Sequence, residues 1–121
     1  MIVGTGVDIT EVRRLRQAAE KWGEAFLDRV FTKDELKNAR KRVSLYQHLA
    51  GRFAAKEAIF KAMGDVRLSW QDLEIFNDKD GRPHCRILNP KFKKAKIQVS
   101  ISHVKNYAVA NAIVTQGPRS K

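Results

Sequence analysis

The chain has 121 residues, and its 24 lysines and arginines against 13 aspartates and glutamates give a formal net charge of +11. This length fits a single domain with one hydrophobic core, and no apolar stretch is long enough to span a bilayer. The single cysteine, Cys85, excludes an internal disulfide. The N-terminal run lacks the basic and apolar regions of a signal peptide, so we expect a cytoplasmic protein.

The excess of basic residues indicates a polyanionic partner, because such a partner relieves the self-repulsion of a strongly charged domain. Nucleic acid qualifies, as do an anionic membrane and an acidic protein with or without a phosphate-rich small ligand. Composition alone favours nucleic acid among these classes.

The first third of the chain predicts a strand followed by short helices. Residues 1–9 form the strand, in which two glycines permit a close approach of another backbone. Thr10 is the predicted N-cap of a short helix. The apolar residues of 22–31 predict a second helical piece.

Two capping signatures mark the next helices. Thr32 and Glu35 have the spacing of a capping box, so a helix is expected to begin there. Ser44 and Gln47 repeat that spacing and open the longest predicted helix, which ends at Gly64, a residue suited to the end of a helix.

The rest of the chain predicts strands joined by short turns. The segments 73–76 and 82–88 flank 77–81, a hairpin signal. The segment 96–103 alternates between apolar and polar residues, and 107–114 is an apolar strand. Short turns require antiparallel pairing, so we predict an α+β fold with an antiparallel sheet covered by the long helix and short N-terminal helices.

A single domain over residues 1–115 and a flexible tail over 116–121 complete the predicted organisation. The tail contains glycine, proline and basic residues, which are typical of a loose chain end.

Glu57 and Lys61 stand out inside the long helix, because they lie one turn apart among alanines and aromatic residues. A solvated ion pair, worth a few tenths of a kcal/mol, is the plain structural interpretation, and the pattern alone favours it. Asp8 at the end of the first strand is, by itself, best explained as a turn or capping residue. Together, Asp8 and Glu57 offer two carboxylates that suit Mg²⁺, which keeps waters and accepts phosphate oxygens.

Ser102 and His103 suggest a hydrolase, but the chain has no G-x-S-x-G turn and no identifiable acid partner. A hydrogen-bonded structural histidine remains one interpretation, and contact with a ligand phosphate is the other. The spacing of a His/Cys zinc site is absent from the sequence.

Three segments occur in the order and spacing of one family. They are Gly4-Thr5-Gly6-Val7-Asp8-Ile9, then Gly51-Arg52-Phe53-Ala54-Ala55-Lys56-Glu57-Ala58 with Lys61 and Gly64, then Val99-Ser100-Ile101-Ser102-His103. The hairpin residues Asp80-Gly81-Arg82-Pro83 fit the same pattern. On these residues the chain resembles, from Met1 to about Val114, the holo-acyl-carrier-protein synthases, small members of the 4′-phosphopantetheinyl transferase superfamily. Each motif is weak alone, but the ordered set is highly specific.

The resemblance implies a reaction that supports fatty acid biosynthesis. Coenzyme A donates 4′-phosphopantetheine to a serine of apo acyl carrier protein and leaves as adenosine 3′,5′-bisphosphate. Asp8 and Glu57 are then expected to hold Mg²⁺, and Lys61 to place a cation beside the diphosphate. Glu57 is also a candidate to accept the serine proton, directly or through a water on the metal. The residues expected to contact coenzyme A are Lys41, Arg42, Arg52, Lys56, Lys61, Gly64, Pro83, Ser102 and His103, with Lys41 and Arg42 as candidates for the 3′-phosphate.

The helix after the first strand is similar to the family's carrier-docking helix. This similarity implies docking contacts by Arg13, Arg14, Lys21, Phe26 and Arg29. An acidic carrier protein and polyanionic coenzyme A also account for the basic charge, with no nucleic acid partner and no membrane insertion. Relatives of this size are homotrimers with active sites between subunits, and the resemblance implies the same assembly here.

Two departures from the family pattern and two rival functions remain. Val104 follows the strand histidine where many relatives carry a hydroxyl or acidic residue, and 64–68 is shorter than their glycine-containing loop.

A basic nucleic-acid-binding protein explains the charge but leaves Asp8 and Glu57 unexplained. A carrier-binding relative without catalysis is disfavoured, because Asp8, Glu57 and Lys61 are all intact.

Overall fold

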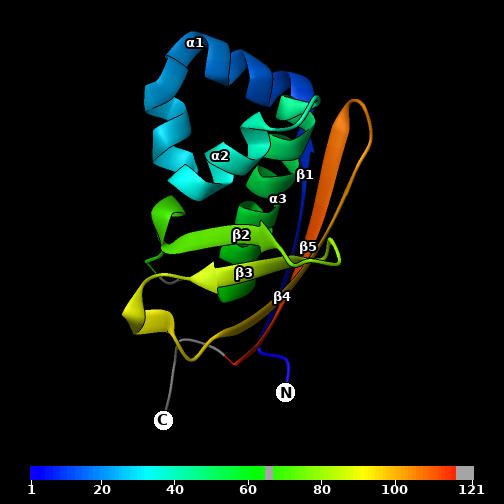
Figure 1. Cartoon of the computed structure of the whole chain (residues 1–121). Helices are drawn as coiled ribbons and strands as arrows, with labels where there is room; N and C mark the ends of the chain where they lie inside the picture. The colour runs from blue at the N-terminus through cyan, green and yellow to red at the C-terminus, as the bar shows by residue number, and fades with distance from the viewer. Residues whose placement is uncertain (65–66, 117–121) are drawn as a thin grey trace.

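The computed structural model describes residues 1–64 and 67–116 and has an α+β fold (Figure 1). Its elements in chain order are β1 (Gly4–Glu11), α1 (Val12–Val30), α2 (Lys33–Arg40), α3 (Leu45–Met63), the 3₁₀ turn η1 (Trp70–Asp72), β2 (Leu73–Asn77), β3 (Pro83–Ile87), the 3₁₀ turn η2 (Pro90–Phe92), β4 (Lys96–His103) and β5 (Tyr107–Gln116).

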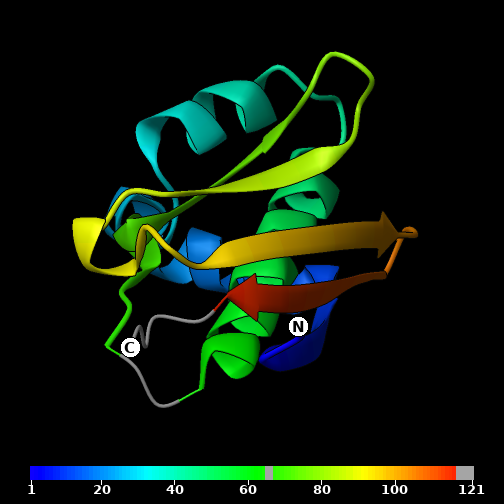
Figure 2. The same ribbon diagram turned by 90° about the horizontal axis from the view of Figure 1, so that it is seen from below.

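The strands are antiparallel, as predicted, but they form two sheets. One has the order β1-β5-β4, and β2 pairs with β3 in a separate hairpin. Helix α3 packs along the three-stranded sheet, and β4 and β5 cross over it in Figure 2. In Figure 1, α1 and α2 lie at one end of α3.

Local signals account for most element boundaries. The two predicted N-terminal helical pieces are the halves of α1, divided at Gly23, whose φ of 67° lies in the left-handed region. The Thr32–Glu35 capping box is present at the start of α2. Helix α3 begins after Ser44, as predicted, although the Ser44 side chain makes no capping hydrogen bond within the described part of the chain. It ends at Gly64, where φ is 79°.

Thr10 is not the N-cap that the sequence suggests. The N-cap of α1 is Glu11, and β1 continues through Thr10 to that residue. The Thr10 hydroxyl instead donates a hydrogen bond to the carboxylate of Asp8, two residues earlier on the same face of the strand. At the other end of the chain, β5 continues to Gln116, and the remainder of the predicted tail lies outside the described residues.

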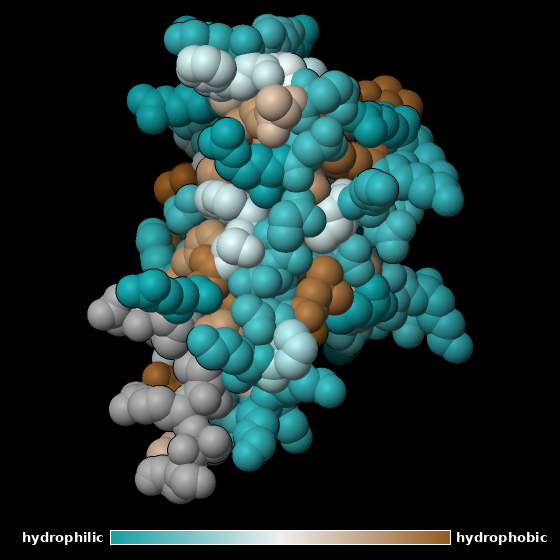
Figure 3. Space-filling view, turned by 90° about the vertical axis from the view of Figure 1, so that its left-hand side faces the viewer, coloured by the Kyte–Doolittle hydropathy of each residue, from teal (hydrophilic) through white to brown (hydrophobic). Residues whose placement is uncertain are grey.

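Alanines on α3 let the helix approach the sheet closely. Ala54, Ala55 and Ala58 are completely buried, and they face Ala110 and Ala112 of β5 across the main core. A second cluster joins α1, α2 and the first turns of α3. The side of the molecule opposite the three-stranded sheet is mostly hydrophilic in Figure 3, in keeping with the high content of charged residues. Within residues 1–64 and 67–116, no helix has the length and apolar character needed to cross a membrane.

Candidate active site

Asp8 lies on the side of β1 that faces α3. Its Oδ2 accepts the hydrogen bond from the Thr10 hydroxyl at 2.9 Å, and its Oδ1 lies 3.5 Å from the Lys61 ammonium. Lys61 also donates to the carbonyl of Val7 at 2.9 Å. The Asp8 side chain is 17 % exposed and that of Lys61 is 56 % exposed, so both groups remain accessible to a ligand.

A close approach of two backbones brings Asp8 to Glu57. A Cβ atom on Gly6 would lie 2.0 Å from the carbonyl oxygen of Ala58, and a Cβ on Gly4 would clash equally with the next turn of α3. Only glycine allows this separation. Because Ala58 follows Glu57 directly in the helix, the contact positions one carboxylate from the strand beside one from the helix.

The two carboxylates influence each other electrostatically. Burial raises the pKa of Glu57, repulsion from Asp8 raises it further, and Lys61 partly offsets both effects. Two carboxylates whose mutual repulsion is only partly offset supply hard oxygen donors that fit Mg²⁺, which completes its coordination with waters and phosphate oxygens. A cluster of three or more His, Cys, Asp or Glu groups able to hold a metal is absent from the described residues, so the fit rests on these two carboxylates.

The carboxylates line a groove that helix α1 borders. Arg14 and Phe26 come from α1, and Phe53 comes from α3. The Phe53 ring stacks on that of Trp70 with centroids 5.1 Å apart. Arg14 forms an ion pair at 3.0 Å with Glu11, yet 82 % of its side chain remains exposed. We call this the carboxylate groove: the predicted metal ligands and two of the predicted docking residues share it.

The remaining predicted docking residues are exposed positions of α1 outside this groove. They are Arg13, Lys21 and Arg29. The Lys21 ammonium lies 4.9 Å from the ring centroid of Trp22, which is itself 61 % exposed.

A second groove, which we call the basic groove, lies between α3, the end of β4 and the β2–β3 hairpin. Four basic residues line it, namely Arg42, His48, Arg52 and His103. Pro83 lines it from β3. Burial lowers the pKa of Arg52 to about 10, which leaves its guanidinium charged at neutral pH. This concentration of donors suits a phosphate group. The two grooves share no lining residue.

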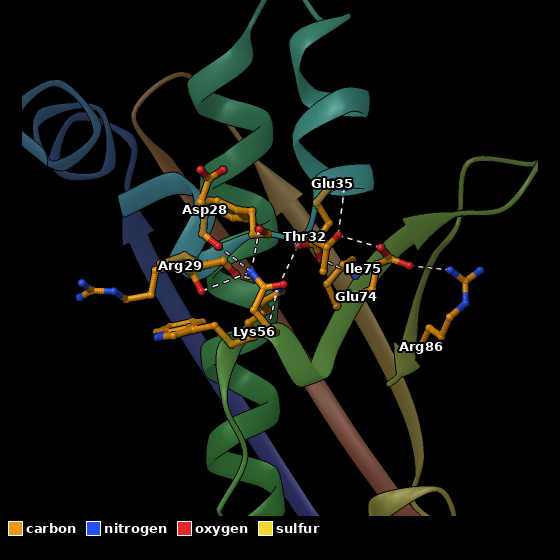
Figure 4. A network of polar contacts seen from close by, with 12 residues as sticks. Asp28, Arg29, Thr32, Glu35, Lys56, Glu74, Ile75 and Arg86 are labelled. Atoms are coloured by element: carbon orange, nitrogen blue, oxygen red, sulfur yellow. Dashed lines mark hydrogen bonds and ion pairs between the residues drawn. The ribbon is translucent and has the colours of Figure 1, made fainter. Parts of the chain in front are cut away.

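Lys56, a predicted ligand contact, is fully buried and lines neither groove. Its ammonium lies 2.8 Å from a Glu35 carboxylate oxygen and donates to the carbonyls of Val30 at 2.9 Å and Trp70 at 3.0 Å (Figure 4). These partners occupy the whole donor capacity of the ammonium group. Lys56 is therefore a structural residue.

The Lys56–Glu35 pair belongs to a larger buried network (Figure 4). Glu35 accepts hydrogen bonds from the backbone N–H of Thr32 at 2.8 Å and of Ile75 at 2.6 Å. The Thr32 hydroxyl donates at 2.7 Å to Glu74. The network joins the α1–α2 junction to α3 and to the hairpin, so it sets the position of α2 and of the basic segment that follows it.

Besides Lys56, four predicted contact residues line neither groove, and one of them, Lys61, lies beside Asp8 as described above. Lys41 and Gly64 are exposed at the ends of α2 and α3. Ser102 is exposed on the face of β4 that points away from α3, in alternation with the half-buried Ile101.

Sequence reasoning missed His48 and the orienting role of Thr10. His48 interrupts an apolar helix face and precedes Arg52 by one turn, a spacing that puts both on one stripe. Thr10 follows Asp8 by two residues, the spacing of neighbours on one face of a strand. Both spacings are visible in the sequence, but interpreting either one requires knowing which face of the helix or strand is buried.

Comparisons with known proteins place the chain in a family. The model of the 4′-phosphopantetheinyl transferase superfamily matches residues 4–112. The holo-[acyl-carrier-protein] synthase of Thermodesulfovibrio yellowstonii is 46 % identical over 95 % of this chain and 100 % of that protein. The corresponding protein of Protochlamydia amoebophila is 44 % identical over 93 % of this chain and 98 % of that protein.

A solved structure agrees with these sequence matches. A holo-(acyl-carrier-protein) synthase from Bacillus anthracis, crystallised in complex with CoA (3′,5′-ADP), is similar with a TM-score of 0.81 and 36 % identity. The match covers 94 % of this chain and 96 % of that one. With the same fold, and with a family match that spans β1, α3 and β4, this chain belongs to the 4′-phosphopantetheinyl transferase superfamily.

Proposed function

We propose that this protein is a holo-[acyl-carrier-protein] synthase. It transfers 4′-phosphopantetheine from coenzyme A to a serine of apo acyl carrier protein, releases adenosine 3′,5′-bisphosphate, and thereby supports fatty acid biosynthesis in the cytoplasm. The observation that carries the proposal is the carboxylate groove, in which Asp8 and Glu57 lie beside Arg14 and Phe26 of α1. A metal–diphosphate site and a carrier-docking surface must adjoin for this reaction.

Asp8 and Glu57 are the proposed Mg²⁺ ligands. When bound, the ion neutralises charge on the diphosphate oxygens and acts as a Lewis acid. The Thr10 hydroxyl orients the Asp8 carboxylate. Lys61 is accessible and has one contact to a backbone carbonyl, so its ammonium can also bind a diphosphate oxygen.

The transfer forms a bond from the carrier serine oxygen to the phosphorus that carries the pantetheine arm. The bond from that phosphorus to the bridging oxygen breaks, and the bridging oxygen leaves with adenosine 3′,5′-bisphosphate. The serine proton goes to a base, and Glu57 is the proposed acceptor in the groove. Its half-buried position in the groove supports this role.

Charge complementarity supports the choice of an acidic carrier protein. The net charge of +11 favours encounter with an anionic partner. Arg14 and Phe26 offer that partner a cation and an apolar contact at the edge of the carboxylate groove. Arg13, Lys21 and Arg29 extend the proposed docking surface along α1.

We further propose a homotrimer in which one coenzyme A spans two subunits. The basic groove is the proposed site of the 3′-phosphate, through Arg42 and Arg52, with Pro83 and His103 as further contacts in the groove and Lys41 and Ser102 as proposed contacts outside it. It shares no residue with the carboxylate groove of the same chain. Drawing one groove from each of two neighbours would allow both to contact a single ligand.

The uncovered face of the three-stranded sheet supports this assembly. Val7 and Ile9 of β1 are 59 % and 64 % exposed there, and Tyr107 and Val109 of β5 are 44 % and 38 % exposed. Apolar residues gathered on an otherwise basic protein mark an interface. We propose that two further copies of the chain cover this face. In a cyclic trimer each subunit makes the same heterologous contact with the next, and the ring closes so that no contact surface is left free.

Intact-mass analysis of an apo carrier protein tests the reaction directly. Incubation with this protein, coenzyme A and Mg²⁺ should add one phosphopantetheine mass, and chelation of the metal should prevent the addition. A carrier whose acceptor serine is replaced by alanine is the matched control. An unchanged mass under conditions where the protein is folded would refute the proposed function.

Subunit mixing tests the shared site. Glu57→Ala and Arg52→Ala subunits should each be inactive alone, and their mixture should recover part of the activity, because some interfaces then have both grooves intact. Light scattering should give three chains per particle. A fully active monomer would refute the shared site and require one chain to bind the whole ligand.

A further inference from the structure

His48 has a buried polar atom without a hydrogen-bond partner. Its Nε2 is the one buried side-chain nitrogen or oxygen without a partner in the described part of the chain, and the residue is only 8 % exposed. Buried polar atoms in native proteins are nearly always paired. Because His48 lines the basic groove, the missing partner has an obvious route of entry.

The groups that face His48 are positively charged or neutral. Arg52 comes from α3 itself, Arg42 from the segment between α2 and α3, and His103 from the end of β4. The hairpin contributes residues that do not titrate, namely Asn77, Gly81 and Pro83. Burial, and then repulsion from Arg52 and Arg42, lowers the pKa of His48 to about 4, so its ring is neutral at physiological pH.

We propose that His48 is a phosphate-contacting residue of the basic groove and that its ring takes up a proton when a phosphate group enters. This inference rests on the proposed function, because it assigns a further residue to the groove proposed for the 3′-phosphate. The phosphate supplies the acceptor that Nε2 lacks. Its negative charge also offsets the repulsion from Arg42 and Arg52 that keeps the ring neutral in the free protein.

The sign of the resulting pH dependence follows from linkage. A bound anion raises the pKa of the imidazolium, so the complex binds more protons than the free protein does. Affinity for phosphate therefore increases as pH falls through the higher pKa of the complex, and the gain saturates below the pKa of about 4 in the free protein. If binding raises the pKa by about two units, the His48 contribution amounts to about a tenfold gain between pH 8 and pH 5.

Adenosine 3′,5′-bisphosphate is the probe, and His48→Gln is the matched variant. Glutamine keeps an N–H donor but cannot take up a proton, whereas His48→Phe removes the donor as well. Calorimetry should show the ratio of wild-type to His48→Gln affinity rising about tenfold from pH 8 to pH 5. Protonation of the ligand phosphate, which has a pKa near 6, affects both proteins and cancels in the ratio. His48→Phe should bind more weakly than His48→Gln at every pH.

NMR of the wild-type histidine rings tests the same point without relying on a variant that folds. The His48 resonance should be insensitive to pH between about 5 and 8 in the free protein and should titrate within that range when the bisphosphate is bound. An affinity ratio that does not change with pH, or a ring that stays neutral in the complex, would overturn the proposal.

The inference and the proposed function fail in different ways. If the carrier protein gains the phosphopantetheine mass while His48 shows no ligand-linked titration, the inference is wrong and the function stands. If His48 titrates with the bisphosphate but no carrier protein is modified, the groove binds phosphate as inferred and the proposed reaction is wrong.

Discussion

Replacing Lys56 by methionine should destabilise the fold strongly without removing a ligand contact. Methionine keeps the length and apolar body of the side chain but deletes the ammonium. That deletion leaves the Glu35 carboxylate buried without its cation, and the carbonyls of Val30 and Trp70 without a donor. Removing one member of a buried ion pair destabilises a protein by about 3–5 kcal/mol.

This free energy corresponds to a large change in melting temperature. At about 2.1 cal/mol/K per residue, the unfolding entropy of 121 residues is about 0.25 kcal/mol/K. A loss of about 3–5 kcal/mol then lowers Tm by about 12–20 °C. Circular dichroism melting measures the shift, and urea unfolding at constant m gives the free energy independently.

A double-mutant cycle separates the ion pair from other effects of the substitution. Glu35→Gln replaces one acceptor oxygen by an N–H₂ group in a site where Lys56, Thr32 and Ile75 all donate, so it should also be severely destabilising. The double variant should lose less stability than the sum of the two single losses, because its second substitution removes no further ion pair. Additive losses would refute the pairing argument.

Lys61→Met is the matched control on the same helix. Its side chain is 56 % exposed, so the variant should change stability by no more than about 0.5 kcal/mol while transfer is lost. Folded Lys56→Met at low temperature should retain coenzyme A binding. If that binding disappears while the fold persists, the structural assignment of Lys56 is wrong.

Four further results are expected. Asp8→Ala and Glu57→Ala should each abolish transfer in a folded protein, measured by carrier mass, and near-normal activity with Mg²⁺ present would exclude the metal assignment. Arg14→Glu should weaken carrier binding far more than coenzyme A binding, measured by calorimetry at two salt concentrations; equal losses would move Arg14 to the cofactor site. Because burial and repulsion from Asp8 raise the pKa of Glu57 in the metal-free protein, protons should compete with Mg²⁺ at a higher pH than they do at an ordinary glutamate, so that Mg²⁺ affinity falls on acidification; an affinity that does not change on acidification would contradict this. Gly6→Ala should lower both Tm and transfer, since its Cβ would lie 2.0 Å from a rigid backbone oxygen of Ala58; an unchanged Tm would mean that the strand and helix separate at little free-energy cost.

Local chemistry made much of the fold predictable. The capping box of Thr32 and Glu35, the left-handed Gly64 and the alternation of 96–103 each depend on neighbours within a few residues. The N-cap assigned to Thr10 failed because its hydroxyl has a competing partner in Asp8. The division of the strands into two sheets could not be predicted in this way, because strand pairing depends on residues that are far apart in the sequence.

The sequence by itself singled out Asp8 and Glu57 as a candidate carboxylate pair, because their motifs occur together in a specific order, and the structure places both in one groove. Only the tertiary structure distinguished Lys56 from Lys61, the two lysines that flank Glu57 in one helix. Five residues separate them, which places their side chains about 140° apart around the helix axis. One therefore points into the junction of α1, α2 and the hairpin, where Glu35 neutralises it, and the other reaches β1 and solvent. The tertiary structure also brought Arg42, His48 and His103, from three separate segments, into one groove, because only packing decides which distant side chains face each other.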